Sequence, residues 1–228
     1  MPDPTSDSRP VCLFDLNGTL LDLSALDPYF ARAFGDPGVR ALWFRQTLEL
    51  ALTQTAIGSY TSFDRLAAAA LDMVAARRGV TVSAADKKDI LGGTSTLPAF
   101  PDVPEALEVL RGAGHRLAAL TNSPLPIAQA QVAHARLSGF FEQVLSADTA
   151  GQLKPGPKPY AHAAERLGVA PGHVRMVAAH SWDVAGALAV GMKAAFVARP
   201  DQALSPLGPQ PEVAGADLWE VARRISGA

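Results

Sequence analysis

The sequence predicts an α/β protein built on a parallel sheet, with a helical segment inserted after the first strand. Short apolar runs alternate along the chain with helical patterns, as in parallel sheets whose strands are joined by crossover helices. The first gap in this alternation, residues 24–96, contains only helical patterns. A helical insertion at that place would stand over the carboxyl ends of the strands, where open α/β sheets bind ligands.

The apolar runs predict five buried strands. These strands are expected at Val11–Phe14, Leu117–Leu120, Gln143–Leu145, Val174–Ala179 and Ala194–Ala198. Helices are expected at Val103–Arg111, Ile127–Ala135, Tyr160–Leu167, Val184–Val190 and Asp217–Ile225. The Pro-rich stretch Arg199–Pro211 is expected to be a surface loop.

These elements divide the chain into a core and a cap. Residues 1–10, rich in Pro, Ser and Asp, are expected to form a flexible tail. Residues 11–23 and 97–228 are expected to form the core domain, and residues 24–96 the helical cap domain. Within the cap, Asp36 before Pro37, and also Ser83, are expected to be helix N-caps, because their side chains accept hydrogen bonds from backbone N–H groups.

Composition and charge exclude several classes of function. The chain has 228 residues, of which 48% are hydrophobic, and this is ample for a core. Its formal net charge of −2 provides no basic surface for nucleic acid. No apolar stretch has the length of a membrane span or the pattern of a secretion signal, so we expect a cytoplasmic protein that binds neither nucleic acid nor membrane.

Polar side chains follow several of the predicted strands at the point where each strand ends. Because the carboxyl ends of parallel strands meet at one edge of a sheet, these side chains are expected to share one crevice. A lone polar residue at a strand end is most simply a turn former, but a shared location favours a functional site. The set comprises Asp15, Asn17 and Thr19 after the first strand, Thr121, Asn122 and Ser123 after the second, Lys154 after the third, and His180, Ser181, Trp182 and Asp183 after the fourth.

The stretches FDLNGTLLD, LTN, LKPGPKPY and AAHSWDVAGA, in this order, resemble the four motifs of the haloacid dehalogenase superfamily. The resemblance implies a Rossmann-like core and a hydrolase whose covalent nucleophile is Asp15. It implies that Thr19 and Thr121 hold this carboxylate and the bound substrate by hydrogen bonds. Lys154 would pair with Asp15, and Asp183 would be the acid of the fourth motif.

Asn17 distinguishes between two branches of this superfamily. Most members are phosphatases with a second acid two residues after the nucleophile, and an amide cannot transfer the proton that this acid supplies. The fourth motif also offers a single acid, Asp183, to a Mg²⁺ ion that prefers several oxygen ligands. The chain therefore resembles more closely the 2-haloacid dehalogenases, metal-free enzymes whose halide leaving group needs no proton.

This closer resemblance implies hydrolytic dehalogenation of a small 2-haloacid to a 2-hydroxy acid through an aspartyl ester, with no cofactor. Asp183 would orient or activate the water that cleaves the ester. Ala41–Trp43, Phe63, Tyr160 and the pair Trp182–Asp183 match this branch as well.

The chain departs from this branch at two functional positions. The arginine that usually follows the ALW sequence is replaced by Phe44, and Arg45 comes one residue later, about 100° further around a helix, which leaves open whether it faces the site. The usual asparagine of the fourth motif is replaced by His180, which is expected to donate a hydrogen bond to the carboxylate or halide. The residues expected to contact the substrate are Leu16, Asn17, Phe44, Arg45, Phe63, Thr121, Asn122, Tyr160, His180, Ser181 and Trp182, and the expected catalytic set is Asp15, Thr19, Lys154 and Asp183.

Two alternatives remain open at this point. The first is a Mg²⁺-dependent phosphatase that uses an unusual acid such as His180, and the second is a catalytically silent binding protein with the same fold. The presence of both Asp15 and Lys154 favours an enzyme. The expected partner is a small carboxylic acid, and the oligomeric state is left open, a dimer included.

Overall fold

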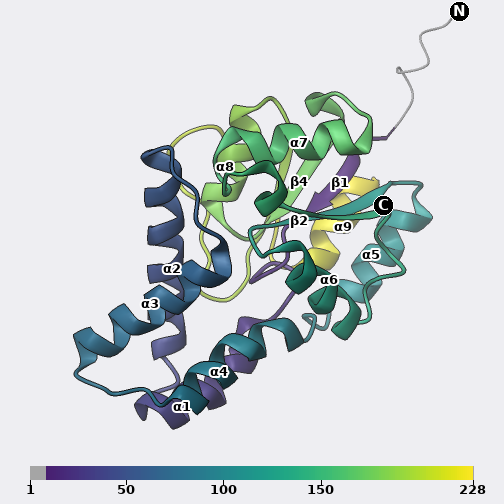
Figure 1. The fold of residues 1–228 in the computed structure, drawn as a ribbon. Helices are drawn as coiled ribbons and strands as arrows, with labels where there is room; N and C mark the ends of the chain where they lie inside the picture. The colour runs from purple at the N-terminus through teal and green to yellow at the C-terminus, as the bar shows by residue number, and fades with distance from the viewer. Residues whose placement is uncertain (1–8, 228) are drawn as a thin grey trace, which may run out of the picture.

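The computed structural model describes residues 9–227, so that most of the predicted tail, residues 1–8, lies outside the described residues. Its centre is a parallel six-stranded sheet with the order β3-β2-β1-β4-β5-β6 (Figure 1). The strands are β1 (Val11–Phe14), β2 (Leu117–Thr121), β3 (Gln143–Ser146), β4 (Val174–Ala178), β5 (Lys193–Val197) and β6 (Val213–Gly215). The predicted fold class is therefore confirmed.

Helices cover both faces of this sheet, as the uninterrupted apolar runs of its strands require. Successive residues of β1 point to opposite faces, so that Phe14 packs with α5, α6 and α9, whereas Leu13 packs with α7 and α8. These helices are α5 (Val103–Gly112), α6 (Leu125–His134), α7 (Pro157–Leu167), α8 (Ser181–Ala189) and α9 (Leu218–Ser226). Two apolar layers therefore hold the carboxyl ends of the central strands in fixed positions.

The edge strand β6 was not predicted from the sequence. It is three residues long, follows the Pro-rich loop and pairs only with β5. Its residues are at most partly buried, and such a short, half-exposed strand leaves no apolar run in the sequence.

The segment between β1 and β2 forms a separate group of helices beside the sheet (Figure 1). It contains η1 (Leu23–Leu26), α1 (Asp27–Phe34), α2 (Val39–Ala56), α3 (Phe63–Arg78), α4 (Ala84–Gly93) and η2 (Thr94–Thr96). The two chain connections of this segment run side by side, because the N–H of Asp22 donates to the carbonyl of Pro98 over 2.9 Å and that of Phe100 to Leu20 over 2.9 Å. We use the name cap for residues 24–96.

The two predicted N-caps of the cap helices have different outcomes. Ser83 accepts a hydrogen bond from the N–H of Asp86 over 3.0 Å and caps α4, so this prediction is confirmed. The prediction for Asp36 is wrong, because α2 begins at Val39 and its N-cap is Gly38. The Asp36 carboxylate instead accepts from the N–H of Gly38 over 2.9 Å and closes the turn before the helix.

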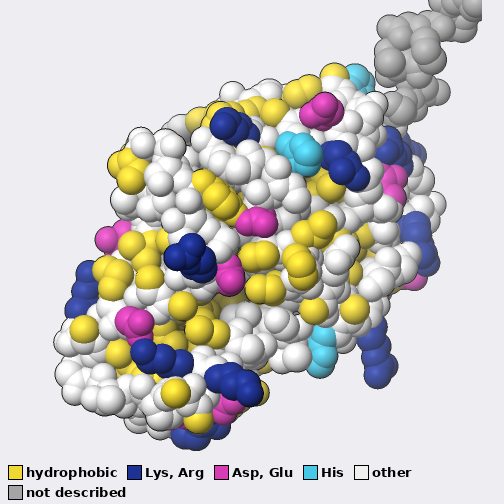
Figure 2. Space-filling view, in the orientation of Figure 1, with side chains coloured by type: hydrophobic (Ala, Val, Ile, Leu, Met, Phe, Trp, Pro, Cys, Tyr) yellow, Lys and Arg dark blue, Asp and Glu magenta, His cyan; other side chains and the backbone are white. Residues whose placement is uncertain are grey.

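The charges on the surface and the length and polarity of the helices concern the predictions about nucleic acid and membrane. On the face shown in Figure 2, basic and acidic side chains are interspersed, and hydrophobic side chains gather along the junction of cap and core. Within residues 9–227, no helix combines the length and apolar character that crossing a membrane requires.

Arg199, in the loop after β5, ties the loop after β1 to two helices of the core. Its Nε donates to the carbonyl of Thr19 over 2.9 Å, and its Nη1 donates to Asp102 over 2.8 Å. The same oxygen of Asp102 accepts from the N–H of Leu218 at the start of α9, over 2.7 Å. The guanidinium also lies over the ring of Phe100, 4.1 Å from its centroid. The conformation of the loop that follows β1 thus depends on a buried cation.

We expect Arg199→Ala to lower the free energy of unfolding by about 2–3 kcal/mol, because it leaves Asp102 and a carbonyl without their buried partner. Urea denaturation monitored by circular dichroism measures the difference. Arg65→Ala, an exposed arginine of α3, is the matched control and should change stability by less than about 0.5 kcal/mol. Equal stability of the two variants would contradict the role of Arg199.

Candidate active site

The central strand β1 delivers Asp15 to the place where the strand order reverses. The chain proceeds from β1 through β2 to β3 on one side of the sheet, and from β4 through β5 to β6 on the other. Asp15 is the first residue after β1 and is only 4% exposed. In open α/β sheets the crevice at this reversal is the usual position of a ligand site.

Three side chains donate hydrogen bonds to the carboxylate of Asp15. Lys154 Nζ donates to Oδ1 over 2.9 Å, and Thr19 Oγ1 donates to Oδ2 over 2.7 Å. The Nδ1 atom of His180 lies 3.1 Å from Oδ2. Because a carboxylate only accepts hydrogen bonds, Nδ1 must carry the proton of this contact. The carboxylate is therefore held from both sides, with its oxygens in unequal surroundings.

This environment keeps Asp15 ionised. Burial is the largest single effect and by itself raises the pKa of Asp15. The positive charge of Lys154 and the hydrogen bonds from His180 and Thr19 together outweigh it, so that the pKa lies well below its usual range. A buried carboxylate that stays charged and meets a cavity is suited to act as a nucleophile.

Lys154 is completely enclosed and bridges two acids. Besides Asp15, its Nζ donates to Asp183 Oδ2 over 2.6 Å and to the carbonyl of Leu120 over 2.9 Å. Its backbone N–H donates to Asn122 Oδ1 over 2.8 Å, which fixes the chain at this point. Burial by itself lowers the pKa of Lys154. The two carboxylates raise this pKa by a larger amount, so that it lies above its ordinary value.

Asp183 and Tyr160 support Lys154 from the side away from the cavity. The hydroxyl of Tyr160 donates to Asp183 Oδ1 over 2.6 Å, and both side chains are buried. Burial raises the pKa of Asp183 above its ordinary value, although the positive charge of Lys154 acts in the opposite direction. Burial also raises the pKa of Tyr160 well above 10, and the carboxylate of Asp183 adds to the effect. Both residues act on the cavity through Lys154.

The donor set does not fit a Mg²⁺ ion, which the phosphatase alternative would require. The two acids of the site, Asp15 and Asp183, are both paired with the ammonium of Lys154. In the part of the chain that the structure describes, no cluster of three or more His, Cys, Asp or Glu side chains is arranged to hold a metal. Hard divalent ions need more oxygen ligands than remain free here.

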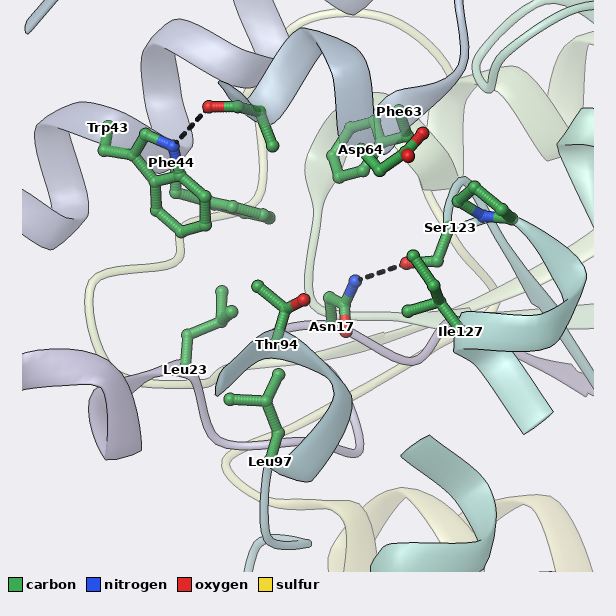
Figure 3. Close-up of a pocket in the computed structure, with 12 residues that line it drawn as sticks. Asn17, Leu23, Trp43, Phe44, Phe63, Asp64, Thr94, Leu97, Ser123 and Ile127 are labelled. Carbon is green, nitrogen blue, oxygen red and sulfur yellow. Dashed lines mark hydrogen bonds between the residues drawn. The ribbon is translucent and has the colours of Figure 1, made fainter. Parts of the chain in front are cut away.

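The side chain of Asn17 is engaged in a network that joins core and cap. Its Nδ2 donates to Ser123 Oγ over 3.0 Å (Figure 3), and its Oδ1 accepts from Gln131 Nε2 over 2.8 Å. Gln131 also donates to the carbonyl of Thr94, at the end of the cap, over 2.8 Å. Sequence reasoning missed Gln131, because a glutamine inside a predicted helix carries no signal of a long-range contact.

Cap and core together enclose an inner cavity in front of Asp15. Its volume is about 10 Å³, room for about one water molecule. The core contributes Asp15, Asn17, Thr121, Asn122, Lys154, His180 and Trp182, and the cap contributes Phe44, Leu48 and Phe63. Leu48 was not predicted, because an apolar residue on a helix is most simply a core residue. The nucleophile thus faces a small space with polar walls on the core side and apolar walls on the cap side.

An aromatic wall separates this inner cavity from an outer basin of about 340 Å³. The rings of Phe44 and His180 lie 5.9 Å apart, and those of His180 and Trp182 stack at 5.2 Å. These three residues, with Leu48, line both spaces. Arg45 is exposed and lines the basin, outside the inner cavity.

Several predicted contact residues lie away from the inner cavity. Leu16 is buried, and its carbonyl accepts from the N–H groups of the turn after β1. Ser181 accepts a hydrogen bond from the N–H of Ser205 over 3.0 Å. Tyr160 lies behind Lys154. These three residues are positioned to support the loops of the site, and their contact with a substrate stays a prediction.

Fold and site together define the class of the protein: an α/β protein with a buried aspartate and lysine at the switch point of a parallel sheet, covered by a helical insertion. The family model described as haloacid dehalogenase-like hydrolase matches residues 10–191. The chain belongs to this family of hydrolases.

Individual relatives agree with this assignment. (S)-2-haloacid dehalogenase 4A of Burkholderia cepacia is 31% identical over 219 residues, 93% of this chain and 94% of the relative. (S)-2-haloacid dehalogenase 1 of Pseudomonas sp. (strain CBS-3) is 31% identical over 190 residues, 82% of this chain and 84% of the relative. The solved structure of L-2-haloacid dehalogenase from Xanthobacter autotrophicus, with chloropropionic acid covalently bound, superposes with a TM-score of 0.89 at 25% identity, covering 96% of this chain and 99% of that one.

Gly18 makes room for His180, and Gly18→Ala is therefore expected to displace the imidazole. Gly18 has φ +78°, and an added Cβ would lie 3.2 Å from Cε1 of His180. Gly58→Ala is the matched control, because Gly58 has φ +68° with no atom within 4 Å of the added Cβ. Both variants should lose about 1 kcal/mol of stability from backbone strain, but only Gly18→Ala should shift the imidazole NMR signals of His180. Unchanged His180 signals would contradict the packing.

Stability should fall in alkaline solution because the pKa values of Tyr160 and Lys154 are raised in the folded state. The unfolded chain releases these protons from about pH 10 upward whereas the folded chain keeps them, so their contribution is present below pH 10 and lost above it. We expect Tyr160→Phe to reduce the slope of unfolding free energy against pH above pH 10 by up to about 1.4 kcal/mol per unit. Urea titrations between pH 8 and 11 test this, with Tyr29→Phe as control; equal slopes in both variants would count against it.

Proposed function

We propose that this protein hydrolyses the carbon–halogen bond of a small 2-haloacid to give a 2-hydroxy acid, without a metal ion. The observation that carries the proposal is the pairing of an ionised, buried Asp15 with an Asn17 whose amide is already bonded to Ser123 and Gln131. The site thus offers a carboxylate nucleophile but no acid two residues later. A halide leaves as a stable anion and needs none.

In the first half of the reaction, Asp15 attacks the carbon that bears the halogen. Oδ1 accepts one hydrogen bond and Oδ2 accepts two, so a free lone pair remains on Oδ1. This oxygen forms the new bond to carbon, and the halide departs with the electron pair of the broken bond. The product of this step is an ester of Asp15. The cavity in front of Asp15 is small, so a bound substrate would leave little room for water to compete for the charge of the carboxylate.

In the second half, water adds to the carbonyl carbon of the ester. The charge develops on Oδ2, where the hydroxyl of Thr19 and the Nδ1–H of His180 already donate. Asp183 receives the proton of the water by way of Lys154, whose ammonium passes a proton to Asp183 Oδ2 as it takes one from the water. The bond between the ester carbon and Oδ1 breaks, and Oδ1 leaves with the second proton of the water as the hydroxyl of the 2-hydroxy acid. The carboxylate of Asp15 is restored with the oxygen of the water in place of Oδ1. Halide and one proton are the remaining products.

The identity of the relatives supports the same reaction. Several relatives of matching length are named 2-haloacid dehalogenases, and in the structure from Xanthobacter autotrophicus chloropropionic acid is covalently bound. The phosphatase alternative is disfavoured because Asn17 supplies no acid two residues after Asp15. The silent binding protein is disfavoured by the intact hydrogen bonds from Lys154 and Thr19 to Asp15.

The test is halide release from chloroacetate and from racemic 2-chloropropionate, in EDTA and in Mg²⁺, beside hydrolysis of p-nitrophenyl phosphate. We expect halide release that is equal in both conditions, and a loss of at least about a thousandfold in Asp15→Asn, which removes the nucleophile. Asp148→Asn, a core aspartate outside the inner cavity, is the control for the charge change. Phosphate release that requires Mg²⁺, with no halide, would contradict the proposal.

A further inference from the structure

The 2-haloacid proposed above carries a carboxylate, and the inner cavity holds no unpaired ammonium or guanidinium to receive it. Of the described residues that line this cavity, only Lys154 is a lysine or arginine, and its ammonium already donates three hydrogen bonds within the protein. Arg45 lines the outer basin instead. The charge of Asp15 also repels a second carboxylate. Recognition of the substrate carboxylate in this cavity therefore depends on neutral hydrogen-bond donors.

The side-chain amide of Asn17 is such a donor. Asn17 lines the inner cavity, and its Nδ2 carries two N–H groups. One of them donates to Ser123 Oγ over 3.0 Å. The other has no hydrogen-bond partner within residues 9–227. Asn17 can therefore donate this second N–H to a ligand in the cavity.

The orientation of this amide follows from hydrogen bonds that begin at the cap. The carbonyl of Thr94 can only accept, so the atom of Gln131 that lies 2.8 Å away must be its Nε2. The same nitrogen lies 2.8 Å from the Asn17 side chain, and the atom that faces it must be the acceptor Oδ1. The amide of Asn17 is thus fixed with its Nδ2 toward Ser123 (Figure 3) and its Oδ1 toward Gln131.

The burial of Gln131 by itself costs stability. Its side chain is completely buried on α6, and among the described residues its Oε1 has no hydrogen-bond partner. A buried acceptor without a partner destabilises the folded state. The two hydrogen bonds that Nε2 donates, to Asn17 and to Thr94, are therefore the contribution of this side chain that offsets its cost.

We propose that Gln131 is a positioning residue, which holds the amide of Asn17 so that Nδ2 donates to the carboxylate of the substrate. With the amide turned over, Oδ1 would face Ser123 and the cavity, and it would repel a carboxylate. Because Gln131 is itself oriented by the carbonyl of Thr94, the donor in the core depends on the position of the cap. This inference rests on the proposed dehalogenation, and it adds how the acid group of the substrate is recognised.

The first experiment measures the binding of propionate and of propionamide by isothermal titration, because neither compound carries a leaving group. Asn17→Leu removes the donor, and it should weaken the binding of charged propionate about tenfold or more and that of neutral propionamide by only about threefold. Gln131→Met leaves the amide free to turn over, and it should weaken propionate binding about threefold to tenfold. Gln129→Met is the matched control on the same helix, and its exposed side chain predicts wild-type affinity.

Gln131→Glu is a second variant that keeps the size of the side chain, should the methionine not be tolerated. An ionised Glu accepts from Nδ2 of Asn17 but cannot donate to its Oδ1, so it turns the amide over. The loss of propionate affinity should be at least as large as in Gln131→Met. Wild-type affinity in either variant of Gln131, or equal losses for propionate and propionamide, would overturn the inference.

A double-mutant cycle separates positioning from a purely structural role. Because Gln131 acts on the ligand through Asn17, Gln131→Met should cause no further loss of propionate binding in the Asn17→Leu background. Additive losses would overturn the inference. So would a failure of the wild-type protein to bind propionate.

Halide release from 2-chloropropionate separates this inference from the proposed reaction. Gln131→Met should raise KM and leave kcat within about twofold of wild type, since the amide binds a group that takes no part in bond breaking. Halide release by all variants with unchanged propionate binding would overturn the inference and leave the dehalogenation standing. Selective loss of propionate binding in the variants, with no halide release by the wild type, would support the role of Gln131 and overturn the proposed reaction.

Discussion

The ammonium group of Lys154 is the interaction on which the rest of the site depends. It donates to Asp15, to Asp183 and to the carbonyl of Leu120, so it joins the ends of β1 and β2 to the start of α8. Removing such an ion from water costs several kcal/mol, and only a complete set of partners offsets this cost. Asn122, which accepts from the backbone N–H of Lys154, and Tyr160 of α7, which donates to Asp183, hold this arrangement in place.

His180 connects the charged interior to the aromatic boundary of the site. Its ring donates to Asp15 at one edge, stacks on Trp182 and approaches Phe44 of the cap. Phe44 stands where the resemblance to 2-haloacid dehalogenases implies an arginine, and His180 of the core donates to the nucleophile. A site built in this way places hydrogen-bond donors close to Asp15, whereas Arg45 lines the outer basin.

The sheet and its connections could be predicted because they depend on local pattern. A strand buried on both faces requires an uninterrupted apolar run, and β1 has the bounds that were predicted for it. The N-cap prediction is confirmed for Ser83, which stands directly before a helical pattern. The same prediction is wrong for Asp36, because closing a turn and capping a helix favour the same residue type. The strand β6 escaped prediction because a three-residue edge strand leaves no such run.

The sequence by itself determined which chemical groups stand at the strand ends, because parallel topology brings those ends together whatever the details of packing. Only the tertiary structure decided where each side chain points. It directs Arg45 to the basin and Ser181 to Ser205, and it brings Leu48 and Gln131 into the site from the interiors of two helices. The rotation of a helix against the core follows from contacts between residues far apart in the chain. A local pattern contains no information about such contacts.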